Sequence, residues 1–308
     1  SSSPDIMYLA GYQPGTYKIT VFEKGTSTVL DEKPIEVTDT WNNSKDGPPF
    51  WFNEVVSNQA YGAAWGGGGT GVQNFSTIPA TGTRKIAIVL IDTDSDRYTT
   101  STTELDSIKK RWKDEIVDGL NVGGTDISTR KFYQEVSDGN FDIQADVFGP
   151  VSLPNGFKSY FSLNTARNIW APGGSYYQSA ITAADGLVNY NNYQSLLFVS
   201  KSWDDSSFFA WPYASICSWG PYTTAEGNFN FGVSSMPVDW EIVDGRMIYQ
   251  TYTHEFGHNL CMGDQYNPDV PGRNPGHWEM MHADGRLPHF SIAHRLMLGW
   301  IDPSDVES

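Results

Sequence analysis

Two histidines four residues apart, with a glutamate directly after the first, are the side chains of this sequence best suited to catalysis. They are His254, Glu255 and His258. Because residues four apart lie on one face of an α-helix, the two imidazoles could aim at a single metal ion. Two histidine nitrogens and one further ligand suit Zn²⁺ and leave a position open for water. The metal would lower the pKa of that water, and Glu255 would take its proton.

The third ligand is expected just beyond the helix that carries these residues. Residues 247–252 lead into the motif without a helix breaker, and Gly263 offers a stop for the helix. Asp264 follows this stop, where a chain that turns back can bring its carboxylate to the metal. The spacing therefore predicts a metal helix followed at once by an acidic ligand.

The motif and its surroundings resemble the immune inhibitor A (M6) metallopeptidases, a metzincin-like family of zinc endopeptidases. Residues 254–267 are similar to the family segment H-E-F-x-H-x-L-G-x-x-D-x-Y-D, and residues 278–281 to its W-x-x-M turn. The resemblance implies that Asp264 is the third zinc ligand. It also implies that Met281 forms a soft, apolar floor below the imidazoles.

The resemblance extends over about residues 84–302. It implies an α+β fold with an α/β-like upper subdomain, which is a metzincin-like zinc peptidase catalytic domain. In such a domain a twisted sheet and a backing helix lie above the active-site helix. The other segments that carry the similarity are residues 85–92, 132–142 and 288–301.

Two positions depart from the family pattern. Cys261 stands where the family has a glycine that leaves the helix with positive φ, a conformation that costs a residue with a β-carbon about 1 kcal/mol or more. Either Cys261 is still helical and Gly263 makes the turn, or Asp264 lies differently. Glu279 is then the alternative third ligand, a carboxylate downstream of the helix as in thermolysin-type sites. Asn267 replaces the last family aspartate, which weakens a calcium role there.

Further polar residues are candidates for supporting roles. His282 directly follows the methionine turn and is a candidate to donate a hydrogen bond to the transition state, with Tyr266 as a second candidate; a surface or packed histidine is the alternative for His282. Asp92, Asp94 and Asp96 alternate along the chain and resemble the start of a Ca²⁺ loop, because hard oxygen ligands must converge. The later glycine and glutamate of an EF-hand are absent, so a solvated strand end is the alternative.

The two cysteines, Cys217 and Cys261, could form one disulfide in an oxidising compartment, or they could remain two buried thiols. A disulfide would tether the metal helix to residues 214–222. Sequence spacing alone does not decide between these alternatives.

The composition favours a secreted protein and excludes some partners. The length of 308 residues suits one large domain, alone or with an appendage, and 39% hydrophobic residues are enough for a sizeable core. Only 18% of the residues are charged and Gly, Ser and Thr are plentiful, a composition typical of a loop-rich, secreted protein. The net charge of −16 argues against nucleic acid and anionic membranes as partners. No apolar run is long enough for a transmembrane helix. The chain has no signal-peptide pattern and does not begin with Met, so we expect a processed or trimmed form.

Three regions are expected along the chain. Residues 1–40 read as accessory β-strands, an immunoglobulin-like module or its remnant, and residues 41–83 as a linker rich in glycine and aromatic residues that packs on the catalytic domain. Residues 84–308 form the catalytic domain. Within it we expect strands over 85–91, 141–147, 151–153 and 196–200, and helices over 101–117, 132–138 and 176–188.

These observations predict a secreted, monomeric zinc endopeptidase that cleaves proteins or glycoproteins. The alternative is a glycan- or protein-binding module on a degenerate peptidase scaffold with structural zinc, motivated by Cys261 and the aromatic-rich flanks. Glu255 argues against it, because a structural site has no use for a base. Zinc-dependent hydrolysis of a non-peptide substrate is a third hypothesis.

Overall fold

The structure is a computed structural model that describes residues 15–22, 29–37, 78–164, 169–201, 212–241, 245–265, 279–282 and 287–301. The chain divides into two units, residues 74–301 and residues 1–73 with 302–308. In the second unit the structure describes two antiparallel strands, β1 (Gly15–Phe22) and β2 (Val29–Val37). The strands expected within residues 1–40 are therefore present.

The larger unit contains the candidate metal-binding residues and is built of both strands and helices. In chain order its described elements are β3 (Gly82–Thr93), α2 (Thr102–Lys113), the π-helical turn η2 (Asp114–Asp118), β4 (Leu120–Val122), β5 (Thr125–Ile127), α3 (Thr129–Val136), β6 (Phe141–Leu153), η3 (Phe157–Ser159), β7 (Phe161–Asn164), β8 (Ile169–Pro172), α4 (Gly174–Ala184), η4 (Tyr190–Asn192), β9 (Ser195–Ser200), β10 (Tyr213–Ala214), β11 (Trp219–Thr224), β12 (Gly227–Pro237), α6 (Ile248–Asn259) and α7 (Ile292–Met297).

A mostly parallel sheet forms the centre of this unit, so the fold is mixed α/β. Its strand order is β10-β12-β9-β3-β6, and β11 pairs in addition with β12. The strands β12, β9, β3 and β6 run parallel, whereas β10 is antiparallel to β12. The apolar run of β3 is buried over its whole length, as expected for a strand covered on both faces.

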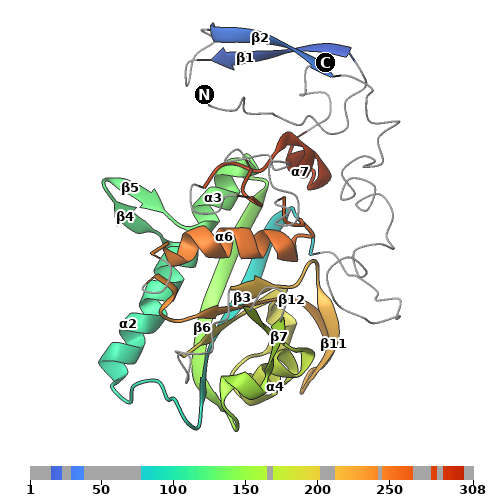
Figure 1. Cartoon of the computed structure of the whole chain (residues 1–308). Coiled ribbons are helices and arrows are strands. Elements are labelled where there is room, and N and C mark those ends of the chain that lie inside the picture. The colour runs from blue at the N-terminus through green and yellow to red at the C-terminus, as the bar shows by residue number, and fades with distance from the viewer. Residues whose placement is uncertain are drawn as a thin grey trace. The chain divides into compact units, whose positions relative to one another are not determined.

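Alternate residues of the central strands contribute to two separate cores. One face of the sheet packs against α2, α3 and α6, and the other against α4 (Figure 1). Because successive side chains of a strand point to opposite faces, a single apolar strand supplies both cores. On the α6 face lie Ile86, Ile88, Leu90, Trp112, Tyr133 and Phe256, and on the α4 face Ala87, Val89, Ile91, Tyr176, Tyr177 and Ile181.

The strand expectations differ from the structure in one place. The two short strands expected over 141–147 and 151–153 are one strand, β6. Its register with β3 shifts where Gly149 and Pro150 lie opposite Leu90. A β-carbon on Gly149 would lie 2.7 Å from the backbone oxygen of Leu90. A glycine and a proline that read as a break in the sequence are thus accommodated as a bulge.

Candidate metal centre

The helix that carries the two histidines, α6, is enclosed on nearly all sides. All of its residues except Gln250 are buried. Its first turn is held by Glu115, whose carboxylate accepts a hydrogen bond from the Tyr249 backbone N–H at 3.1 Å. The Tyr133 hydroxyl donates to the Thr253 carbonyl at 2.9 Å. A carboxylate at the N-terminus of the helix interacts favourably with the helix dipole. These two contacts hold α6 in place without any bound ligand.

The end of α6 is made by Cys261 and not, as expected, by Gly263. Cys261 has φ +72° and follows the last helical residues in the left-handed conformation. Its N–H donates to the His258 carbonyl at 2.8 Å, and the Met262 N–H donates to the Gly257 carbonyl at 3.1 Å. This pair of bonds is the Schellman arrangement, which usually has glycine at this position. Cys261 therefore adopts the backbone conformation that the family glycine would supply.

Because the chain reverses at Cys261, it returns toward the histidines. Asp264 Oδ1 lies 3.1 Å from His254 Nε2 and 3.4 Å from His258 Nε2. The ligand atoms of the three residues all lie within 4.8 Å of one another, so His254, His258 and Asp264 form a group that could hold a metal ion. The structure thus brings together the three residues predicted as ligands.

Each imidazole is also oriented through its other nitrogen. His254 Nδ1 lies 3.0 Å from the Met280 carbonyl, and His258 Nδ1 lies 2.7 Å from the Met262 carbonyl. A carbonyl oxygen only accepts hydrogen bonds, so Nδ1 carries the proton in both rings. Each Nε2 of a neutral ring then presents a lone pair toward Asp264. Two lone pairs and a carboxylate oxygen repel one another unless a cation lies between them, so this donor set fits a divalent metal such as Zn²⁺.

Electrostatics at Asp264 agree with a site for a cation. Burial alone would raise the pKa of its carboxyl. With no metal ion bound, protons on the histidine Nε2 atoms take the place of the cation, and positive charge on His258 and hydrogen bonds from both histidines outweigh burial and hold the pKa of Asp264 well below its usual range. A metal ion in the same place would act in the same direction, because it also favours the carboxylate.

Two buried methionines, Met280 and Met281, follow Glu279 and lie near α6. Both side chains are fully buried. A β-carbon built on Gly257, which lies between the two histidines, would be 2.7 Å from Met281 Sδ and 3.1 Å from Met262 Cε. Gly257 is thus a packing position that the sequence does not single out, since only the tertiary structure shows that a side chain there would displace Met281.

Glu279, the alternative third ligand, has other partners. Its carboxylate lies 3.1 Å from His294 Nδ1 and accepts backbone hydrogen bonds from Met281 and Ser291. Burial would raise the pKa of Glu279, but the contacts with His294 and Ser291 lower it below its ordinary value. This residue therefore joins the methionine segment to the start of α7 and is not part of the metal-binding group.

The remaining candidates are placed as follows. Glu255 is 8% exposed and directly follows His254 on α6. His282 donates its backbone N–H to the Glu279 carbonyl at 3.0 Å. Tyr266 lies outside the described residues, so its role in the transition state stays a prediction.

The aspartates proposed for Ca²⁺ are engaged within the protein. Asp92 is buried and accepts hydrogen bonds from the Tyr98 N–H at 3.0 Å and from Arg97 at 3.3 Å. Asp94 also pairs with Arg97. Among the residues that the structure describes, the one group of three or more metal-binding side chains is the histidine–aspartate group, so a Ca²⁺ role for Asp92, Asp94 and Asp96 stays a prediction.

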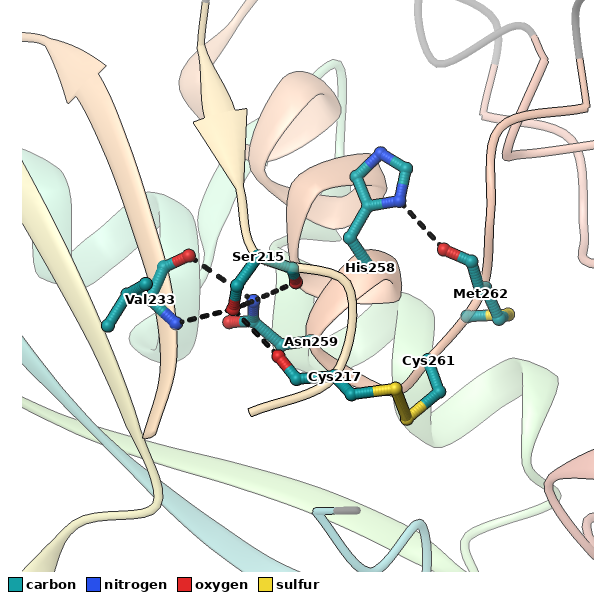
Figure 2. Close-up of a disulfide and its surroundings, with 7 residues drawn as sticks. All are labelled: Ser215, Cys217, Val233, His258, Asn259, Cys261 and Met262. Carbon is teal, nitrogen blue, oxygen red and sulfur yellow. Dashed lines mark hydrogen bonds between the residues drawn. A yellow bond between two sulfur atoms is a disulfide. The ribbon is translucent and has the colours of Figure 1, made fainter. Parts of the chain in front are cut away.

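Cys217 and Cys261 form a disulfide (Figure 2). Of the two alternatives, the bonded form is therefore the one present. The bond joins the turn after α6 to the segment between β10 and β11. No described helix is long and apolar enough to cross a membrane.

No protein-family model matches this chain, and no curated protein matches it significantly. What the fold and the site define is therefore a mixed α/β protein with a buried histidine–histidine–aspartate group suited to a metal ion.

Proposed function

We propose that this protein is a secreted, zinc-dependent endopeptidase of the metzincin-like type that cleaves proteins or glycoproteins. The observation that carries the proposal is that His254 Nε2, His258 Nε2 and Asp264 Oδ1 lie close together near the end of α6. The resemblance to the immune inhibitor A family adds support, because the same three residues match its ligands. The disulfide is consistent with an oxidising compartment.

In this proposal His254, His258 and Asp264 hold Zn²⁺. When bound, the metal polarises the scissile carbonyl and makes water more acidic. Glu255 accepts a proton from the attacking water and passes it to the leaving amine. Met281 and the carbonyls of Met262 and Met280 keep the imidazoles in place during these proton transfers.

An extended substrate would have a strand to pair with. Among the described strands β10 lies at the edge of the sheet, and the Cys217–Cys261 disulfide joins the chain that follows it to the turn after α6. Backbone pairing along such an edge suits peptides of many sequences. This is why we assign the substrate as polypeptide rather than as a small molecule.

One of the two arguments for the alternative, a binding module with structural zinc, no longer holds. The alternative was raised partly because Cys261 replaces a family glycine. Since Cys261 has φ +72° and makes the turn itself, the replacement does not prevent Asp264 from reaching the histidines.

Replacement of Glu255 by Gln tests the proposal. Loss of a general base lowers turnover by about 10²–10⁴-fold, while zinc content stays near one ion per chain because the ligands are intact. Casein cleavage and elemental analysis, with and without a chelator, measure the two effects. The same assays on Glu135→Gln, an exposed glutamate on α3, provide the control. Zinc-dependent cleavage that survives in Glu255→Gln would refute the role of this residue.

A further inference from the structure

Directly after the ligand His258 comes Asn259, a fully buried amide with partners on both of its ends. Its Oδ1 accepts hydrogen bonds from Ser195 Oγ at 2.7 Å and from Ser234 Oγ at 3.3 Å. Its Nδ2 donates to the Ser215 carbonyl at 3.0 Å. Because that carbonyl can only accept, the orientation of the amide is determined by its surroundings.

The sheet leaves a space of matching size for this side chain. Gly232 of β12 lies opposite Ser195 of β9. A β-carbon on Gly232 would lie 2.7 Å from Cβ and Cγ of Asn259. Asn259 therefore rests directly on the backbone of β12, between hydroxyl groups of two neighbouring strands, and it connects the metal helix to the parallel sheet.

The segment that follows β10, which includes Ser215, also holds the helix end. Figure 2 shows Ser215 and Cys217 beside the last turn of α6. The Cys217 N–H donates to the His258 carbonyl at 2.8 Å, and Cys217 is bonded to Cys261. Ser215 Oγ donates to the Cys217 carbonyl at 2.7 Å, which links the two attachments.

We propose that Asn259, its serine partners Ser195, Ser215 and Ser234, and the Cys217–Cys261 disulfide form a clamp that positions His258 and Asp264 for the metal. Asn259 is a positioning residue in this clamp, since it acts through the helix and does not touch the metal position.

His258 needs support from outside the helix because of its position in α6. It belongs to the last turn of α6, and helix ends fray because their final carbonyls lack helical partners. A ligand on a fraying turn must be ordered when metal binds, which weakens binding. The clamp orders this turn beforehand, and through the turn at Cys261 it also sets the path to Asp264.

The inference rests on the proposed metal site but not on peptide cleavage, so metal affinity is the readout. In Asn259→Leu, a buried apolar side chain of similar size replaces the amide and leaves the serine hydroxyls and the Ser215 carbonyl without this partner. We expect the Zn²⁺ dissociation constant to rise about 10–100-fold, the range typical of residues that orient metal ligands. Competition with a chromophoric chelator measures it, and the absorption spectrum of the Co²⁺-loaded protein reports on ligand geometry.

Thr251→Val is the matched control. Thr251 is buried on the same helix and accepts a hydrogen bond from Trp240 Nε1 at 2.9 Å, but it lies in the first half of α6, away from the clamp at its end. Thr251→Val should lower thermal stability while changing the Zn²⁺ dissociation constant by less than about threefold, which is below the roughly 10–100-fold range of residues that orient metal ligands. If both variants weakened Zn²⁺ binding equally, general loss of stability would explain the result and the clamp would be rejected.

Two milder variants cover the case in which Asn259→Leu does not fold. Ser195→Ala with Ser234→Ala removes both donors to Asn259 Oδ1, and Cys217→Ala with Cys261→Gly removes the disulfide but keeps a residue suited to positive φ. Each should weaken Zn²⁺ binding about tenfold or more. Wild-type affinity in both would overturn the clamp. A wild-type protein that binds Zn²⁺ but cleaves no peptide would count against the proposed function alone.

Discussion

At the scale of single residues, the candidate centre depends on which atom of each side chain is already used. Both histidines donate through Nδ1 to carbonyls, which leaves Nε2 for a metal. Asp264 and Glu279 are both carboxylates near the helix end, yet only Asp264 faces the two Nε2 atoms. Glu279 is bonded to His294 instead. The two acids therefore differ in their contacts: Asp264 faces the candidate metal ligands, whereas Glu279 is paired with another part of the chain.

Separate replacement of Asp264 and Glu279 should distinguish a metal ligand from an acid that only stabilises the fold. Asp264→Asn replaces the carboxylate ligand by a neutral amide, and we expect the purified protein to lose most of its Zn²⁺, because carboxylate oxygen and not amide is the usual oxygen ligand of this ion. Glu279→Gln should retain zinc but destabilise the fold by about 1–3 kcal/mol, because buried partners lose a charged acceptor. Elemental analysis and urea unfolding measure the two effects. The opposite pattern, with zinc lost only in Glu279→Gln, would make Glu279 the ligand.

At the scale of elements, α6 is held at both ends by groups from elsewhere in the chain. Its first turn receives the buried carboxylate of Glu115 from the π-helical turn after α2. Its last turn receives Asn259 contacts and the disulfide. Burial raises the pKa of Glu115 above its ordinary 4.5, although the Tyr249 N–H and Arg111 act in the opposite direction.

The raised pKa of Glu115 has a consequence for stability. In the folded protein Glu115 keeps its proton to a higher pH than in the unfolded chain, so the folded state binds more protons in that interval. Its contribution to stability is therefore greatest below the unfolded pKa of about 4.5 and declines as pH rises through the folded pKa.

Glu115→Gln should remove this dependence while retaining an acceptor for the Tyr249 N–H. The wild-type free energy of unfolding minus that of the variant should fall from pH 4.5 upward and then level off. Urea unfolding of the metal-free protein across pH 4–8 measures the difference, and the metal-free form avoids proton release by the ligands. A difference that rises with pH would contradict a raised pKa.

At the scale of the whole molecule, one covalent bond joins segments that are distant in sequence. Cys217 and Cys261 are separated by 44 residues, and the loop they close contains β11, β12 and the metal helix. Both cysteines have positive φ. The sheet, the metal helix and the turn to Asp264 are therefore part of one cross-linked unit.

Removal of this bond should be costly. A closed loop of 44 residues corresponds to about 4 kcal/mol of stabilisation in the chain-entropy estimate. Cys217→Ala with Cys261→Ala should lose about this amount in guanidinium unfolding. Cys217→Ala with Cys261→Gly should lose about 1 kcal/mol less, because glycine adopts positive φ without strain. Equal stability of the two variants would mean that Cys261 is not strained.

The sequence by itself determined the features that depend on near neighbours. Helical spacing placed His254 and His258 on one face, and a continuous apolar run marked β3 as a strand buried on both sides. Local reasoning went wrong at Gly263, because glycine was taken as the natural stop whereas Cys261 makes the turn.

Only the tertiary structure decided the features that depend on partners far along the chain. These are the choice of Asp264 over Glu279 as the acid facing the histidines, the bond between Cys217 and Cys261, and the seat of Asn259 on Gly232. The physical reason is that the local sequence around a carboxylate, a thiol or an amide does not reveal which group it will contact in the folded protein. Its role is set by which groups the packed sheet and helices bring within hydrogen-bonding distance.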